Sequence, residues 1–384
     1  MSHTVPLTLE HVRGALRLEP TARGVAPHRL PAWALAQAAD PQLSMVEAQG
    51  AGVRIALRTA ATSVTLTAHR TRVTYAGAPA RPDGSIDLVV DGEVVARRRT
   101  SGGTTTELDM ATGIPTLIPG DDLVVTFDGL PAYAKDVEIW LPFNETVEIV
   151  EVSANAPVEP PASAGRRWLH HGSSISQGSN AARPTGTWAA VAARRGGVEL
   201  QNLGFGGAAL LDPFVARTMR DTPADLISVS LGINLINSDL MRLRAFRAGM
   251  HGFLDTIRDG HPTTPLLVVT PLHCAIHEAT PGPGAFDTEA LAEGRLAFKA
   301  VGDPAEVPAG RLTLETIRAE TTRLVTERQA GDPHLFLLDG LTLYGAADEA
   351  AHPLRDSLHP DADTHRFVGD RFAHAVFAEG PFAG

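Results

Sequence analysis

The sequence predicts two domains, a β-sandwich followed by an α/β domain whose parallel sheet is covered by helices. The chain has 384 residues, which is longer than one typical domain. Residues 44–152 contain many short segments rich in β-branched residues and separated by turn signals. Beyond residue 165, strand-like segments alternate with helix-like segments, and this alternation is typical of a sheet with helices packed on it.

Six segments of the N-terminal half are interpreted as strands because they are rich in β-branched residues, and several alternate apolar with polar residues. They are residues 53–57, 63–69, 85–90, 93–99, 122–127 and 137–143. Short strands at regular spacing favour a β-sandwich or jelly roll. We therefore expect an N-terminal β domain at residues 1–155. The stretch APVEPPASAG at 156–165 is the expected linker, because it is rich in proline and small residues.

The C-terminal half, residues 166–384, alternates strands with helices. The runs at 224–232 and 265–271 are almost entirely apolar, as expected for strands buried on both faces. Further strands are expected at 166–172, 198–204 and 335–340, and amphipathic helices at 187–196, 241–260 and 312–331.

Composition excludes several classes of function. The formal net charge of −11 argues against a nucleic-acid partner, because phosphate binding needs clustered Lys and Arg. Cys274 is the single cysteine, so neither an intramolecular disulfide nor a zinc site with two cysteines can form. No apolar run approaches the ~20 residues of a membrane helix, and the N-terminus lacks a signal-peptide pattern. We therefore expect a cytoplasmic protein without a membrane partner.

Glycine and polar residues follow the predicted strands, at the edge where open α/β sheets bind ligands. Ser174 follows the first strand, Gly207 the second and Asn234 the third, while Asp356 and His359 follow the last strand after a loop. Serine needs an adjacent base to become a nucleophile, and a neutral imidazole suits that role. A carboxylate holds the tautomer of the imidazole, and N–H donors stabilise a tetrahedral oxyanion. The pattern therefore predicts acyl transfer through a serine.

Four sequence blocks resemble those of the SGNH, or GDSL, hydrolases and occur in the family's order. They are Gly172–Ser176, Asn202–Gly207, Gly232–Asn234 and Asp356–His359. The resemblance implies a three-layer α/β/α domain in which Ser174 is the nucleophile, His359 the base and Asp356 the residue that orients the base. It also implies an oxyanion hole made by the backbone N–H groups of Ser174 and Gly207 and the side chain of Asn234.

Two positions depart from the family pattern. Ser173 stands where the family has aspartate before the nucleophile, and Leu235 stands where it has aspartate after the block-three asparagine. Neither position takes part directly in the expected chemistry, so the reaction type should be unchanged. Ser173 is a second candidate nucleophile, and the block alignment favours Ser174.

Other polar residues have both a functional and a structural interpretation. His171 could line the substrate pocket or could be a packed strand residue. His273 and His277 have a spacing found in metal ligands, but no third ligand is evident and we expect no metal; His273 could instead line the mouth of the site. Residues 275–310 are rich in Gly and Pro and could form a lid or a plain loop. Four apolar residues in this segment could form a wall for an aromatic acyl group: Phe286, Leu291, Leu296 and Phe298.

The motifs predict an acyl-enzyme but do not say what attacks it. Water would make an esterase or carbohydrate O-deacetylase, and an alcohol would make an acyltransferase. The two-domain plan resembles both carbohydrate esterases and GDSL-family acyltransferases of aromatic polyketide tailoring in antibiotic biosynthesis. The latter resemblance implies that a salicylyl-like group moves from coenzyme A, the acyl donor, to a hydroxyl acceptor, with no bound cofactor. A glycan-binding module with an inactive hydrolase fold is the alternative of another class, and the oligomeric state stays open.

Overall fold

The computed structural model describes residues 2–77, 79, 82–109, 112–161 and 165–383. They form two compact units. The first unit holds the chain up to Ala32, together with Ser44–Gly165 and Ala182–Thr185, and the second holds Trp33–Leu43, Arg166–Ala181 and the chain from Gly186 onward. This division differs from the continuous boundaries expected from the sequence, because Trp33–Leu43 groups with the C-terminal half. Within the expected linker, Val158–Glu159 is a strand, and residues 162–164 lie outside the described residues.

The first unit contains two β-sheets, and the predicted N-terminal sandwich is confirmed. One sheet has the order β10-β9-β6-β13-β4-β3, with β1 paired to β13 and β11 to β6. Its strands are β1 (His3–Thr4), β3 (Arg17–Pro20), β4 (Val25–His28), β6 (Ser63–Ala76), β9 (Thr104–Asp109), β10 (Pro115–Ile118), β11 (Leu123–Asp128) and β13 (Thr146–Ala154). The other has the order β14-β5-β12-β7-β8, with β2 paired to β5. Its strands are β2 (Val12–Arg13), β5 (Arg54–Thr59), β7 (Ser85–Val90), β8 (Glu93–Arg99), β12 (Lys135–Trp140) and β14 (Val158–Glu159).

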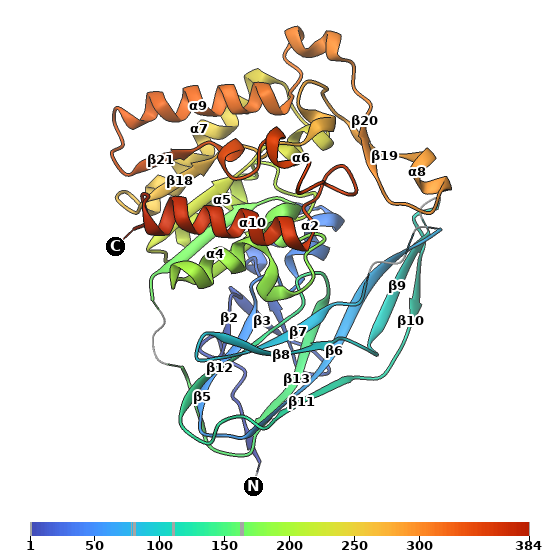
Figure 1. Ribbon diagram of the computed structural model, residues 1–384, viewed down its shortest axis with the longest axis vertical. Helices are drawn as coiled ribbons and strands as arrows, with labels where there is room; N and C mark the ends of the chain where they lie inside the picture. The colour runs from blue at the N-terminus through green and yellow to red at the C-terminus, as the bar shows by residue number, and fades with distance from the viewer. Residues whose placement is uncertain (1, 78, 80–81, 110–111, 162–164, 384) are drawn as a thin grey trace. The chain divides into compact units, whose positions relative to one another are not determined.

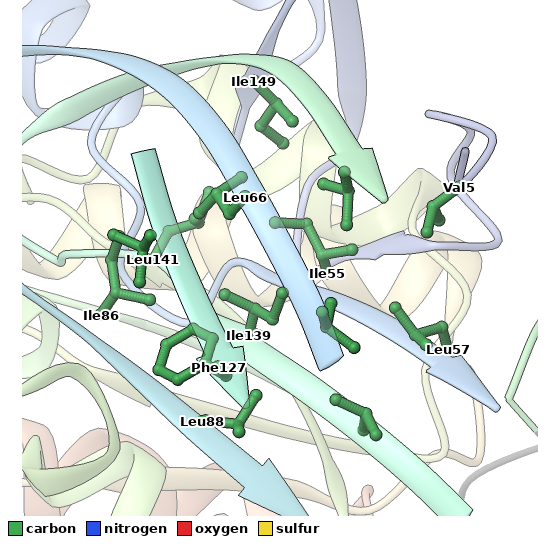
Figure 2. Packing of buried hydrophobic residues seen from close by; sticks show 14 of the residues in the cluster. Val5, Ile55, Leu57, Leu66, Ile86, Leu88, Phe127, Ile139, Leu141 and Ile149 are labelled. Atoms are coloured by element: carbon green, nitrogen blue, oxygen red, sulfur yellow. The ribbon is translucent and has the colours of Figure 1, made fainter. Parts of the chain in front are cut away.

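The core of the first unit is formed by inward-facing aliphatic residues of both sheets, which Figure 2 shows. Strand β11 shows how the sequence produces this core, because buried and exposed residues alternate along it: Phe127 is buried while Val124 is 63% exposed. Across the core, Leu66 of β6 and Ile139 of β12 are both fully buried. The period-two pattern in the sequence therefore places one face of each strand in the interior.

The second unit contains a five-stranded sheet with the order β16-β15-β17-β18-β21, in which all neighbouring strands are parallel. The strands are β15 (Arg167–Gly172), β16 (Glu199–Gly204), β17 (Leu226–Ser230), β18 (Leu266–Val269) and β21 (Leu335–Leu338). Each lies within a segment expected to be a strand.

Helices cover both faces of this sheet. The indole of Trp168 on β15 packs against Trp188 of α4 (Trp188–Gly196) and Phe372 of α10 (Ala362–Phe372). On the opposite face, His171 of β15 stacks on Phe253 of α7 (Leu243–Gly260). Helix α7 contacts α5 (Pro213–Asp221) and α9 (Leu314–Gln329). The three-layer α/β/α arrangement predicted from the sequence is therefore confirmed.

Shorter elements connect these layers. The helices are α1 (Ala32–Ala38), α2 (Pro41–Glu47), α3 (Ser174–Gln177), α6 (Ile233–Asn237) and α8 (Thr288–Ala292), with 3₁₀ turns at Pro184–Gly186, Ala275–His277, Pro304–Ala309, Gly340–Thr342 and Ala346–Asp348, and a π-helix at Ala373–Ala378. Strands β19 (Gly284–Phe286) and β20 (Phe298–Ala300) pair as an arm that carries α8 (Figure 1). No helix among the described residues has both the length and the apolar character needed to span a bilayer.

Candidate active site

The strand order places the candidate nucleophile at a topological switch point. Strand β15 pairs with β16 on one side and with β17 on the other, so the connections that follow β15 and β16 leave the sheet in opposite directions. Ligands of open α/β sheets bind in the crevice that such a reversal opens at the carboxyl ends of the strands. Ser174 directly follows β15, and Asn234 lies just beyond β17 in α6.

The structure brings Ser174 to His359. Ser174 begins helix α3, and its Oγ lies 3.0 Å from Nε2 of His359. Ser173 is the N-cap of the same helix, and its Oγ accepts a hydrogen bond from the backbone N–H of Ile175. The Ser173 side chain is therefore occupied in capping, while the Ser174 hydroxyl has an imidazole as partner.

Asp356 holds the other nitrogen of this imidazole. Nδ1 of His359 lies 2.8 Å from Asp356 Oδ2, and Asn180 donates to the same oxygen at 2.9 Å. The second oxygen, Oδ1, accepts from the backbone N–H groups of Leu358 (3.0 Å) and His359 (2.7 Å). Burial alone would raise the pKa of Asp356, but these hydrogen bonds and the nearby imidazole outweigh it and lower the pKa to about 2. The carboxylate is therefore charged at neutral pH.

The β19–β20 arm and Cys274 support the loop that carries Asp356 and His359. The backbone N–H of Phe298 donates to the carbonyl of Asp356 at 2.9 Å, and its ring meets His359 edge-on with centroids 5.6 Å apart. Ser357 adopts a left-handed conformation with φ 66°, and its carbonyl accepts from the thiol of Cys274 at 3.4 Å. Burial, first of all, raises the pKa of Cys274 to about 12, so the group remains a thiol that can donate.

The three groups expected in the oxyanion hole are all left able to donate a hydrogen bond to a substrate. Gly206 donates its N–H to Oε1 of Gln177 at 2.7 Å, whereas the N–H groups of Ser174 and Gly207 have no acceptor within the described part of the chain. Gly207 has φ +75°, a conformation that favours glycine. Oδ1 of Asn234 accepts from the N–H of Ala209 at 3.2 Å, so its NH2 is the group left to donate. Two backbone donors and one amide can therefore serve a developing negative charge.

The structure does not bring His171 or His273 to the Ser174 hydroxyl. His171 is fully buried on the α7 face of the sheet, with Nδ1 2.7 Å from the carbonyl oxygen of Leu203. His273 pairs with Glu278 at 3.2 Å and with Glu349 at 3.4 Å. Phe286 lies on the arm, is exposed, and packs against Phe298 with the two rings tilted by 31°. Of the four residues expected to form an apolar wall, Phe298 lies against the imidazole of His359 and Phe286 lies against Phe298.

The neighbouring strand histidine, His170, is also a packing residue. Its Nδ1 lies 2.8 Å from Ser228 Oγ and its Nε2 2.8 Å from Ser176 Oγ. Burial lowers the pKa of His170 to about 3, so this imidazole is neutral. It joins β15, β17 and α3 and so holds the turn that leads from β15 to Ser174.

Sequence reasoning missed three polar side chains that shape the site. Asn180 donates to Asp356 from a left-handed backbone position with φ 67°, which asparagine tolerates better than most residues. Gln177 and Gln42 bind the Gly206 N–H and carbonyl, respectively. Asn180 and Gln177 lie close to Ser174 in the sequence and could have been considered. No local signal marks Gln42, because it is 132 positions before Ser174.

The arrangement is chemically suited to activating a hydroxyl group. With its Nδ1 proton donated to Asp356, the neutral imidazole presents the lone pair of Nε2 to the Ser174 hydroxyl. Asp356 and His359 each expose only 7% of their surface, which strengthens their electrostatic interaction. Within the described ranges, no cluster of three or more His, Cys, Asp or Glu side chains is placed to hold a metal ion.

Comparisons with known proteins show which family and fold this chain resembles. Residues 166–280 match the model of the GDSL-like lipase/acylhydrolase family. No curated protein matches the sequence. Among solved structures, the salicylyl-acyltransferase SsfX3 from a tetracycline biosynthetic pathway is 27% identical, with a TM-score of 0.78, over 97% of this chain and 95% of that chain.

Two further structures share the fold over 97% of this chain and 96% of their own. A GDSL-like lipase from Bacteroides ovatus is 17% identical with a TM-score of 0.64. A family-two carbohydrate esterase from Cellvibrio japonicus is 14% identical with a TM-score of 0.55. Both likenesses concern the fold alone. Residues 166–280 therefore match the GDSL-like lipase/acylhydrolase family model, and the whole chain is similar in fold to the salicylyl-acyltransferase.

Proposed function

We propose that the enzyme transfers an aromatic, salicylyl-like acyl group from coenzyme A to a hydroxyl group of a polyketide natural product, through an ester on Ser174. The observation that carries the acyl-transfer chemistry is the continuous hydrogen-bonded series from Ser174 Oγ through His359 to Asp356. The choice of acyl group and donor is drawn from the similarity to the salicylyl-acyltransferase, which extends over both units.

In the first half-reaction, Ser174 Oγ attacks the thioester carbonyl carbon while Nε2 of His359 takes the hydroxyl proton. The carbonyl oxygen becomes an oxyanion, which the N–H groups of Ser174 and Gly207 and the amide of Asn234 stabilise. Collapse of this intermediate breaks the carbon–sulfur bond, and His359 returns the proton to the coenzyme A thiolate. Asp356 stabilises the imidazolium that exists between these two proton transfers.

In the second half-reaction, the acceptor hydroxyl gives its proton to Nε2 of His359 and attacks the ester carbonyl on Ser174. The bond between the acyl carbon and Ser174 Oγ breaks, and Oγ recovers the proton. No redox step or metal is needed, and each proton that His359 takes up is returned within the same half-reaction. The bound groups required are therefore the acyl donor and the hydroxyl acceptor.

Phe298 and Phe286 supply an apolar surface for the acyl group. The ring of Phe298 lies against His359, and Phe286 packs on it with centroids 5.2 Å apart. An aryl group of the ester on Ser174 could stack on this pair, since offset and edge-to-face contacts between aromatic rings are favourable. This arrangement supports an aromatic rather than a small acyl group.

Hydrolysis is the second candidate function, because the family model that matches residues 166–280 describes lipases and acylhydrolases. Water would then attack the same ester on Ser174. The two functions are separated by mixing the intact protein with acyl-coenzyme A thioesters, salicylyl among them, and with p-nitrophenyl acetate, and following the protein mass over time.

A long-lived adduct from an aromatic thioester, discharged by an added hydroxylated polyketide to give its ester, would support the transferase. Rapid turnover of acetate esters without reaction of any thioester would overturn it in favour of the esterase. Ser174→Ala is the control and should form no adduct from any substrate. Absence of every adduct with the native protein would instead favour a glycan-binding role for the first unit.

A further inference from the structure

We propose that Gln42 is a positioning residue for the oxyanion hole, because it fixes and polarises the peptide group whose N–H belongs to Gly207. This inference rests on the function proposed above. Nε2 of Gln42 donates a hydrogen bond to the carbonyl oxygen of Gly206 at 2.8 Å. Gln42 is in helix α2, and the segment Trp33–Leu43 is part of the same compact unit as Ser174.

The effect follows from the geometry of one peptide bond. The Gly206 carbonyl and the Gly207 N–H belong to the same planar trans peptide, so they point in opposite directions. A donor on the carbonyl side therefore fixes the direction of the N–H on the other side of the peptide. Ser174 lies beside this turn, because a Cβ built on Gly206 would be 3.5 Å from Ser174 Cβ. Hydrogen bonding to the carbonyl also polarises the N–H and makes it a stronger donor.

The turn that contains Gly206 and Gly207 needs this external support. Both of its central residues are glycines, and Gly207 has φ +75°, so its backbone has many alternatives. Gln177 fixes one side by accepting the Gly206 N–H. Gln42 fixes the other, and its side chain also covers Gly207, where a Cβ would lie 3.4 Å from Nε2 and 3.6 Å from Cγ. Gln177 therefore holds the peptide group before Gly206, and Gln42 holds the peptide group after it.

The segment that carries Gln42 has its own attachments to this unit. Gln37 accepts a hydrogen bond from Arg217, whose guanidinium also lies 5.3 Å from the ring centre of Trp33. Asp40 accepts the backbone N–H of Gln42 at 2.8 Å, which orients the start of α2. Docking of the segment and positioning of the turn therefore depend on different side chains, and substitutions can separate them.

The decisive variant is Gln42→Met, which keeps the length and the contact with Gly207 but loses the N–H donor. We expect kcat to fall about 3- to 30-fold with KM nearly unchanged, because the hydrogen bond from Gln42 helps to stabilise the transition state and not the bound substrate. The loss should stay within this range because Gln42 is exposed and water can replace its amide. Affinity for benzeneboronic acid, whose tetrahedral adduct places an oxygen in the oxyanion hole, should fall by a similar factor. Gln42→Glu should lose more, because a carboxylate faces the carbonyl.

Gln37→Met is the matched control, since it disturbs the docked segment without touching the turn, and its kcat should remain within about twofold of the native value. The inference is overturned if Gln42→Met keeps native kcat and boronic-acid affinity, or if Gln37→Met loses as much. A native protein that forms no Ser174 adduct with boronic acid or ester would instead reject the proposed function. The two failures are therefore distinguishable.

Discussion

Replacing Asp356 with asparagine should abolish most activity by changing the tautomer of His359. In the native site, Oδ2 of Asp356 faces two donors, Nδ1–H of His359 and the amide of Asn180. Oδ1 faces two backbone N–H groups. An asparagine has only one oxygen, so its NH2 must take the place of either Oδ1 or Oδ2 and face the two donors on that side. If that side is His359, Nδ1 must become an acceptor, and the ring proton moves to Nε2, where it blocks removal of the Ser174 proton.

The expected loss in kcat is about 10⁴-fold, which corresponds to ~5 kcal/mol of transition-state stabilisation. Stability should fall as well. Because the native pKa of Asp356 is about 2 and an unfolded aspartate titrates near ~3.9, the carboxylate contributes ~2–3 kcal/mol above that pH. This contribution declines as pH falls through the native pKa, so it should be much smaller at pH 2.5 than at pH 7.

The assay is kcat/KM with an activated aryl ester, beside denaturant unfolding at pH 7 and at pH 2.5. Retention of more than a tenth of native kcat/KM would refute the role given to Asp356. Equal destabilisation at both pH values would refute the charge-based account of its stability. Asp363→Asn is a suitable control, because Asp363 is an exposed carboxylate of α10 that pairs only at the surface with Arg366.

Three further outcomes are expected. Asn234→Ala removes the amide donor and should lower kcat about 10²- to 10³-fold with little change in KM; an unchanged kcat would exclude Asn234 from the oxyanion hole. Asp212→Asn should stabilise the protein by ~1–2 kcal/mol at pH 8 but not at pH 4. Burial, followed by the charge of Asp40, raises the pKa of Asp212 to about 6, so ionisation of this carboxyl as pH rises destabilises the folded state. Unfolding curves that show the same gain at both pH values would contradict this. Phe298→Ser should reduce kcat/KM for aryl esters more than for acetate esters, while equal losses for both would remove Phe298 from the acyl pocket.

The parallel sheet could be predicted because its strands are continuous apolar runs. Residues 224–232 and 265–271 enclose β17 and β18, since strands buried on both faces leave little room for polar residues. Strands β9 and β10 were missed: β9 is threonine-rich with half-buried residues throughout, and β10 is exposed along its length. Without a buried face, neither has a clear alternation of apolar and polar residues.

The candidate site could be predicted where its residues follow strands in sequence blocks. Ser174 and His359 are 185 positions apart, yet each is placed by its own strand or loop, and the structure brings their side chains together. Gln42 could not be predicted, and Phe298 was expected only as one of four apolar residues that could line the acyl group. Their roles depend on a docked helix and on a two-stranded arm, which are tertiary contacts without a local pattern.

The measurement that tests the central claim most directly is labelling by a fluorophosphonate, which reacts with an activated serine regardless of the natural substrate. The modified residue is located by peptide mass spectrometry in the native protein, Ser174→Ala and Ser173→Ala. The account predicts labelling at Ser174 in the native protein and in Ser173→Ala, and none in Ser174→Ala. Labelling of Ser173, or labelling that persists in Ser174→Ala, would contradict it.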